Sequence, residues 1–164
     1  MIRRVFAILA VMASLVAPAG IQPASASHVA YNIYELPATP LNASPDLREL
    51  SGHITMLITF QPNCAWCPLQ FKAAQEFQRT RAPWLQIAAV SHNGSIPALL
   101  HELDRYQTPF PAYQSSPALL EALEFTPGTP CVYLIGEDGH LGQISCGRKT
   151  PDELVRFLMG QSDR

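Results

Sequence analysis

The spacing of apolar residues changes along the chain and predicts strands that alternate with helices. Residues 54–60 and 85–90 are short, nearly continuous apolar runs, which are typical of strands buried on both faces of a sheet. Between these runs, residues 67–80 carry apolar side chains at roughly helical spacing, with charged residues on the other side. This alternation favours a sheet that is covered by helices.

Serine, threonine and proline residues mark where further helices begin. Ser and Thr side chains cap the first backbone N–H groups of a helix, and proline fits its first turn. Such starts predict helices over residues 44–50, 95–106, 116–125 and 150–159. In the second of these helices, Leu99, Leu100 and Leu103 are expected to face the core.

Two apolar segments near the C-terminus flank a turn sequence. Residues 131–135 and 141–146 are separated by a stretch that contains Asp138-Gly139, which favours a hairpin. Residues 27–43 have the composition of an extended lead-in that is interrupted by prolines. Together these elements predict an α/β domain in which helices flank a central mixed sheet, closed by an antiparallel hairpin.

The first 26 residues have the layout of a secretory signal peptide. Two arginines precede 13 apolar or small residues at positions 5–17, and Ala24-Ser25-Ala26 fits a cleavage site. As a helix the apolar run would span about 20 Å, which is shorter than the hydrocarbon core of a bilayer, about 30 Å. We therefore expect residues 1–26 to be removed and residues 27–164 to form a periplasmic domain. An uncleaved segment would leave that domain anchored to the membrane.

Composition and charge narrow the range of functions. The chain has 164 residues, of which 48% are apolar, and this is enough for one domain with a folded core. Its 11 basic residues against 13 acidic ones give no basic surplus of the kind that nucleic-acid-binding proteins carry. Four cysteines are too few for a disulfide-stapled miniprotein, so their positions need a specific explanation.

The CxxC motif of Cys64 and Cys67 lies between a predicted buried strand and a predicted helix. A zinc site would need a second close pair, whereas 14 residues separate Cys131 from Cys146, and Pro68 stands where haem attachment needs histidine. In this context the motif favours a dithiol–disulfide pair. The helix N-terminus would lower the pKa of the Cys64 thiol from about 8.5 toward about 7. Cys64 is therefore the candidate nucleophile and Cys67 the candidate resolving thiol.

The order of motifs resembles the thioredoxin fold, and more closely the exported TlpA/DsbE-like (ResA-like) thiol-disulfide oxidoreductases. The similarity extends over residues 47–158. Besides the CxxC motif, the matching parts are residues 47–53, Phe60, residues 109–111, residues 128–139, Gly147 and the helix of residues 150–157. The order of these motifs is more specific than any one of them.

The resemblance implies a role for Thr129 and Pro130. Pro130 would be a cis-proline packed against the dithiol, and Thr129 would present backbone groups to an extended substrate, with Trp66 nearby. Strand addition of this kind recognises polypeptide shape, so protein thiols and disulfides are the expected substrates. We expect no cofactor, no bound metal and a monomer, and a reductant of this kind would need electrons from a membrane thiol transporter.

The sequence departs from the family pattern at three places. Asn63 stands where the family usually has tryptophan, and Ala65-Trp66 stand where the pair usually contains proline. Ile58 occupies the position at which thioredoxins keep a buried acid that manages the proton of the resolving thiol. The sequence offers no obvious substitute for that acid.

Cys131 and Cys146 fall nearly opposite each other on the predicted hairpin. Three interpretations stay open: a structural disulfide, two buried free thiols, or a pair that exchanges with Cys64 and Cys67.

The sequence thus predicts an exported thiol-disulfide oxidoreductase, more a reductase or isomerase than an oxidase. The alternative is a binding protein on the same fold, either redox-inert or a copper chaperone in which His140 joins Cys64 and Cys67. Sco-like copper sites separate their cysteines by three residues, whereas two intervene here. The remaining histidines, His28, His53, His92 and His101, fall in predicted loops or on exposed faces.

Overall fold

A single mixed sheet of six strands organises the chain. The computed structural model describes residues 31–107 and 109–161, so the predicted signal peptide and His28 lie outside the described residues. The strands are β1 (Ala38–Leu41), β2 (Thr55–Phe60), β3 (Gln86–Ser91), β4 (Ala112–Ser115), β5 (Cys131–Ile135) and β6 (Leu141–Cys146). They lie in the order β1-β4-β3-β2-β5-β6. The strands β2, β3 and β4 are parallel, and the other neighbours pair antiparallel, which confirms the predicted mixed sheet.

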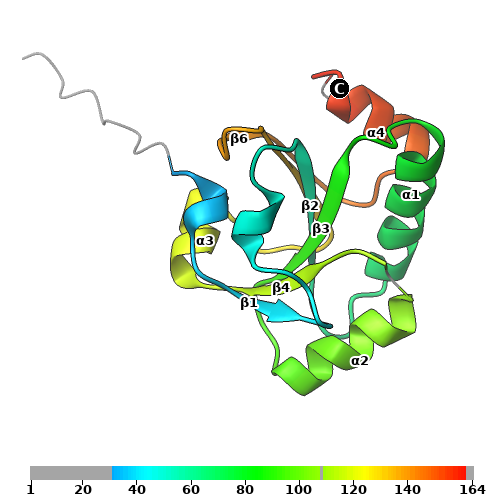
Figure 1. Cartoon of the computed structure of the whole chain (residues 1–164). Coiled ribbons are helices and arrows are strands. Elements are labelled where there is room, and N and C mark those ends of the chain that lie inside the picture. The colour runs from blue at the N-terminus through cyan, green and yellow to red at the C-terminus, as the bar shows by residue number, and fades with distance from the viewer. Residues whose placement is uncertain (1–30, 108, 162–164) are drawn as a thin grey trace, which may run out of the picture.

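Helices cover both faces of this sheet (Figure 1). The first face carries α1 (Cys67–Thr80), α2 (Ile96–Tyr106) and α4 (Pro151–Leu158). The second carries α3 (Pro117–Ala122) and two short 3-10 helices, η1 (Ile33–Glu35) and η2 (Leu47–Leu50). All six residues of β2 are buried between these layers, as its continuous apolar sequence predicts. None of the helices in the described ranges has the length and apolar character needed to cross a membrane.

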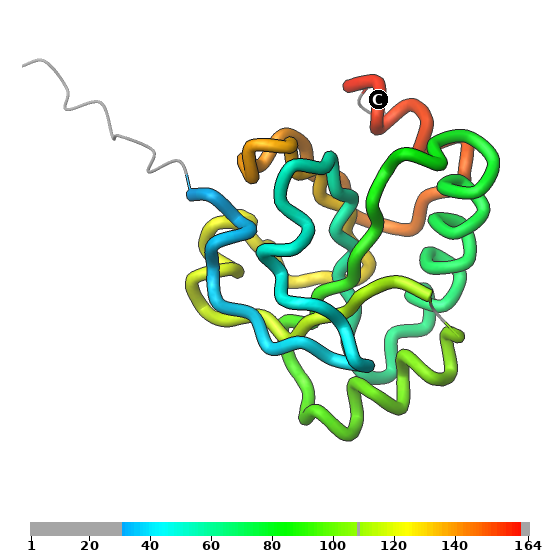
Figure 2. The backbone as a smooth tube through the Cα atoms, in the orientation of Figure 1, coloured from blue at the N-terminus to red at the C-terminus, as the bar shows by residue number. Residues whose placement is uncertain are grey.

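The apolar pattern does not predict the two strands at one edge of the sheet. β1 lies inside the expected lead-in, and β4 lies between two predicted helices. Each has four residues, of which only some are buried, and β1 contains Pro40, which an edge strand tolerates. Figure 2 shows the chain from residue 31, in blue, passing α3 before it enters β1, and the Tyr31 hydroxyl donates to Glu121 Oε1 at 3.2 Å.

The predicted helix over residues 44–50 is shorter than expected. Asp46, and not Ser44, is its N-cap, because the Asp46 side chain accepts the Arg48 N–H and Glu49 accepts the Asp46 N–H in return. The Ser44 hydroxyl instead accepts the Ala112 N–H at 2.7 Å and so ties the segment after β1 to β4. Likewise α3 ends at Ala122, well before the predicted residue 125.

Candidate functional site

The CxxC motif lies where the central strand β2 passes into α1. Cys64 and Cys67 form a disulfide with a Cα–Cα distance of 5.4 Å. Cys67 is the first residue of α1 and is fully buried, whereas Cys64 in the preceding loop is half-buried. An attacking sulfur can therefore approach Cys64 more readily than Cys67. This places the two cysteines as the sequence predicts, with the outer one in the loop and the inner one in the helix.

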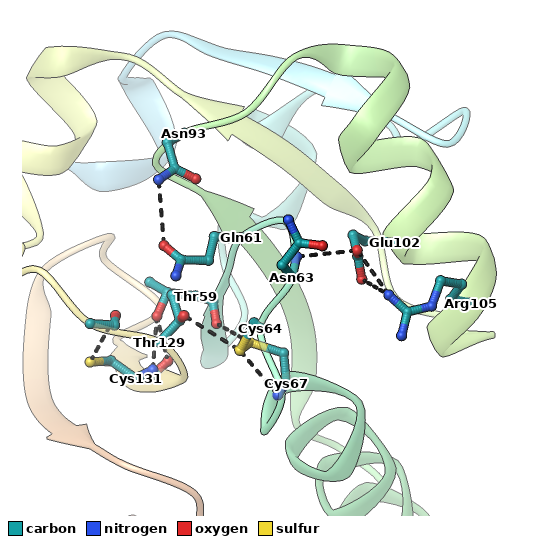
Figure 3. The surroundings of a disulfide bond; sticks show 11 residues. Thr59, Gln61, Asn63, Cys64, Cys67, Asn93, Glu102, Arg105, Thr129 and Cys131 are labelled. Atoms are coloured by element: carbon teal, nitrogen blue, oxygen red, sulfur yellow. Dashed lines mark hydrogen bonds and ion pairs between the residues drawn. A yellow bond between two sulfur atoms is a disulfide. The ribbon is translucent and has the colours of Figure 1, made fainter.

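Two hydrogen-bond donors point at the Cys64 sulfur (Figure 3). The Cys67 backbone N–H, at the start of α1, donates at 3.2 Å. The Thr129 hydroxyl, 65 positions later in the chain, donates at 3.4 Å. Since the N-terminus of a helix also favours negative charge, the surroundings stabilise a thiolate at this sulfur once the disulfide opens.

Thr129 belongs to a loop that faces the disulfide. The Thr129–Pro130 peptide bond is cis. The last paired residues of the β2–β5 ladder are Ile58 and Val132, so Thr129 lies beyond the ladder at the end of the sheet. Its position would allow a further extended chain to pair with it.

A shallow pocket opens beside this loop. Its volume is about 290 Å³, and it is lined by Trp66, Thr129, Pro130, Gly147 and Arg148. The Trp66 side chain is 57% exposed, and the Arg148 guanidinium lies over its ring, 5.8 Å from the ring centre. The pocket therefore combines an apolar surface with one positive charge.

A buried threonine connects the CxxC motif to the second cysteine pair. The Thr59 hydroxyl accepts the Cys131 N–H at 2.8 Å and donates to the Cys131 carbonyl at 3.4 Å. The Thr59 carbonyl oxygen lies 3.9 Å from Cys67 Sγ. Cys131 and Cys146 pair in register across β5 and β6 and form a disulfide. Since the two cysteines are bonded to each other, and Cys146 is exposed while Cys131 is fully buried, they are not two buried free thiols.

A buried carboxylate holds the loop in front of Cys64. Glu102, on α2, has a side chain that is only 5% exposed, and its Oε1 accepts the Asn63 N–H at 3.2 Å. Asn63 has a φ of 61°, a left-handed conformation that asparagine tolerates better than most residues. The Arg105 guanidinium donates to both Glu102 oxygens, at 2.8 and 2.9 Å (Figure 3). Glu102 thus fixes the residue that directly precedes the candidate nucleophile.

The charge state of Glu102 follows from these contacts. Burial alone would raise the pKa of the carboxyl, but the Asn63 N–H, the Tyr106 hydroxyl and the Arg105 guanidinium together outweigh it and hold the pKa below the ordinary value of 4.5. Glu102 is therefore a fixed negative charge at neutral pH. Ile58 stands where thioredoxins have a buried acid, and Glu102 does not take over the role of that acid. A carboxylate that stays ionised at neutral pH holds no proton to donate.

The helical pattern in the sequence missed Glu102. It predicts that Leu100 faces the core, yet Leu100 is 38% exposed and Glu102 is 4% exposed. Leu99 and Leu103 are buried as predicted. The signal that could have identified Glu102 is its pairing with Arg105 three positions later, since a buried acid needs such a partner.

The copper arrangement considered from the sequence is not assembled. His140 lies at the turn of the β5–β6 hairpin, where its Nδ1 is 3.0 Å from Asp138 Oδ2. Cys131 and Cys146 lie at the opposite, open end of that hairpin, which is the end near Cys64. Within residues 31–107 and 109–161, no group of three His, Cys, Asp or Glu side chains is placed to hold a metal ion.

Comparison with known proteins finds similarity in the fold and not in the sequence. No protein-family model matches the sequence, and no curated protein sequence matches it. Among solved structures, dsbF of Mycobacterium tuberculosis matches with a TM-score of 0.65 and 17% identity, covering 81% of this chain and 99% of that one. A secreted M. tuberculosis disulfide oxidoreductase homologous to E. coli DsbE matches with a TM-score of 0.61 and 17% identity, covering 78% and 97%.

A third matching structure is a thioredoxin domain. The thioredoxin domain of a thiol-disulfide oxidoreductase from Bacteroides vulgatus matches with a TM-score of 0.61 and 14% identity, covering 75% of this chain and 89% of that one. The TM-scores establish a common architecture, and the low identities limit the comparison to the fold. The chain has the thioredoxin-like fold that its order of motifs predicts.

Proposed function

We propose that this chain is an exported thiol-disulfide oxidoreductase that acts on protein substrates through Cys64 and Cys67. The observation that carries the proposal is the half-buried Cys64 sulfur, which is bonded to buried Cys67 and receives two hydrogen-bond donors. Thiol–disulfide exchange needs an accessible sulfur, a stabilised thiolate and a second thiol within reach. The site provides all three.

The exchange proceeds in two displacements. The Cys64 thiolate attacks one sulfur of a substrate disulfide, a mixed disulfide forms, and the other substrate sulfur leaves as a thiolate that takes up a proton. The Cys67 thiolate then attacks Cys64 Sγ and releases the second substrate thiol. This step forms the Cys64–Cys67 bond present in the structure, so the protein gives up two electrons and the substrate gains them.

The loop beside Cys64 would hold the substrate. Thr129 lies beyond the last paired residues of β5, so an extended polypeptide could pair with its backbone next to the Cys64 sulfur. The pocket that Trp66 and Arg148 help to line would receive a neighbouring side chain. Because the contacts would be mainly to the substrate backbone, with one shallow pocket for a side chain, we infer protein substrates with little sequence selectivity.

The surroundings of Cys64 favour reduction or isomerisation over oxidation. Both donors at its sulfur are uncharged, and the nearby Arg148 guanidinium stacks over Trp66. The strong oxidant DsbA, at about −120 mV, owes its potential to a strongly stabilised reduced form. Uncharged donors stabilise a thiolate less than cations do, so we infer a potential closer to the thioredoxin value of about −270 mV.

Export and partners belong to the same proposal. Two disulfides within the described residues suit an oxidising compartment, and residues 1–26 have the layout of a signal peptide. One of the structures with the same fold is described as secreted. We infer a periplasmic monomer that receives its electrons from a membrane thiol transporter.

Insulin reduction tests the proposal directly. The purified chain, without residues 1–26, should reduce insulin disulfides in the presence of a dithiol, and Cys64→Ser should abolish this turnover. Cys67→Ser should instead accumulate mixed disulfides with protein partners, because Cys64 can still attack but nothing resolves the adduct. The contrast between the two variants identifies the nucleophile.

Two results would reject this assignment. Turnover that persists in Cys64→Ser would place the chemistry elsewhere, and trapping in Cys64→Ser rather than in Cys67→Ser would reverse the roles. A Cys64–Cys67 reduction potential near the DsbA value of about −120 mV would reject the reductive direction alone.

A further inference from the structure

The Cys131–Cys146 disulfide joins the two segments that form one wall of the pocket beside Cys64. β5 begins at Cys131, directly after Pro130, and β6 ends at Cys146, directly before Gly147. Pro130 and Gly147 both line the pocket, and the Gly147 N–H donates to the Pro130 carbonyl at 2.9 Å. The disulfide therefore holds this wall together.

The two sulfurs of this pair differ in accessibility. Cys131 is fully buried in the core on the second face of the sheet, whereas Cys146 is exposed. Thiol–disulfide exchange depends on which sulfur an attacking thiolate can reach. Attack from solvent therefore falls on Cys146, and Cys131 is the leaving group. The CxxC pair has the same division into an outer and an inner cysteine.

Two basic residues follow Cys146 in the chain. Arg148 and Lys149 follow it closely in the chain, and Lys149 Nζ donates to the Cys146 carbonyl at 3.2 Å. Two cations within three residues of Cys146 attract an incoming thiolate, and attract it more strongly if the thiol also carries carboxylates.

The leaving sulfur already has a hydrogen-bond acceptor. Cys131 Sγ lies 3.7 Å from the Gly128 carbonyl oxygen, and Gly128 directly precedes Thr129. Once the disulfide opens, the Cys131 S–H can donate to this oxygen within the loop that faces Cys64. Opening of the disulfide would therefore change the conformation of the pocket wall and of the loop that contains Thr129.

We propose that Cys146 is a thiolation site for an anionic low-molecular-mass thiol of the glutathione type. The thiol loses its proton, its sulfur forms a bond to Cys146 Sγ, and the Cys146–Cys131 bond breaks. Cys131 leaves as a thiolate and takes up that proton, so the incoming sulfur is oxidised and Cys131 is reduced. Because the exchange releases the wall of the pocket, it regulates substrate binding at Cys64, and in that respect it rests on the proposed function.

The test uses a chain in which only the second pair can react. The Cys64→Ser/Cys67→Ser variant is incubated, folded, with excess reduced glutathione, quenched with acid, alkylated and mapped by peptide mass. The expected result is glutathione on Cys146 and an alkylated thiol at Cys131. A pair that stays oxidised until the protein is unfolded in guanidinium would overturn the proposal, as would an adduct on Cys131.

A matched pair of thiols tests the role of charge. In the same background, Arg148→Gln should slow opening by glutathione roughly threefold to tenfold. It should slow opening by 2-mercaptoethanol much less, because the thiolate is the only negative charge of that reagent. Equal slowing with both thiols would show that Arg148 acts through structure, and would overturn the preference for an anionic thiol.

A separate measurement tests whether opening this disulfide regulates substrate binding. The Cys131→Ala/Cys146→Ala variant, which mimics the open state, should show a raised KM for insulin with an unchanged rate of Cys64 alkylation by iodoacetamide. An unchanged KM would overturn the regulation. If the wild-type chain reduces no insulin at all, the proposed function fails, but the adduct on Cys146 still decides whether the thiolation site exists.

Discussion

The carboxylate of Glu102 and the backbone N–H of Asn63 meet at 3.2 Å across 39 positions of the chain. Asn63 directly precedes Cys64 and has a left-handed φ of 61°, so this contact fixes the loop from which Cys64 reacts. Glu102 also keeps a negative charge close to that loop, because its pKa lies below the ordinary value of 4.5. Glu102 is therefore a positioning residue whose hydrogen bond and whose charge can be tested separately.

Glu102→Gln should make the Cys64 thiolate form more readily. The amide keeps an oxygen that accepts the Asn63 N–H but removes the negative charge, which opposes ionisation of a nearby thiol. The rate of Cys64 alkylation by iodoacetamide, followed against pH, should have its midpoint moved to lower pH by roughly half a unit. Glu76→Gln, on the exposed side of α1, is the control and should not move it. A Glu102→Gln midpoint equal to that of the wild type would leave Glu102 a structural residue only.

Glu102 should also contribute to the loss of stability in acid. Its folded-state pKa is depressed, so its contribution is present above about pH 4.5 and is lost as the pH falls through the lower, folded-state value. Glu102→Ala should lower the free energy of unfolding at pH 7 by about 1–3 kcal/mol, because the Asn63 N–H loses its acceptor. Guanidinium unfolding at pH 7 and pH 3 should show this difference shrinking in acid. A difference that is constant with pH would contradict the assigned ionisation.

The sequence predicts the parts of this site that depend on local patterns. The bounds of α1, β5 and β6 agree with the predicted ranges, because strong apolar periodicity and a turn motif define them. The CxxC motif and the Thr129–Pro130 loop follow from motif order. Glu102 does not, because its burial depends on a backbone N–H that the fold supplies from a distant loop. β1 and β4 escape prediction because each is short and only partly buried.

Thr129→Val should raise the pKa of the Cys64 thiol, because it destabilises the thiolate. Valine keeps the volume of threonine but removes the hydroxyl that donates to Cys64 Sγ at 3.4 Å. A hydrogen bond to a charged group contributes about 1.5–3 kcal/mol, so the midpoint of Cys64 alkylation should rise by about one to two pH units. Thr129→Ser, which restores the hydroxyl, should return the midpoint toward the wild-type value. If valine and serine behave alike, the hydroxyl has no part in stabilising the thiolate.

Thr59→Val should loosen the connection between the two disulfides. The Thr59 hydroxyl is the acceptor for the Cys131 N–H at 2.8 Å, and both groups are buried, so valine leaves this N–H without its partner. The expected cost is about 1–3 kcal/mol in the free energy of unfolding. Because Cys131 follows Pro130 directly, the pocket should also hold substrate less well, and the KM for insulin should rise.

Thr55→Val is the matched control for this change, since Thr55 is buried on the same face of β2 and its hydroxyl accepts from the Tyr34 hydroxyl at 3.0 Å. Tyr34 keeps a second acceptor in the His53 carbonyl at 2.7 Å, so this variant should cost only about 1 kcal/mol. It lies at the other end of β2 from the CxxC motif and should leave the KM for insulin unchanged. If the two variants raise the KM equally, the effect reflects general loosening of β2, and Thr59 has no specific part in holding Cys131 and the Pro130 loop.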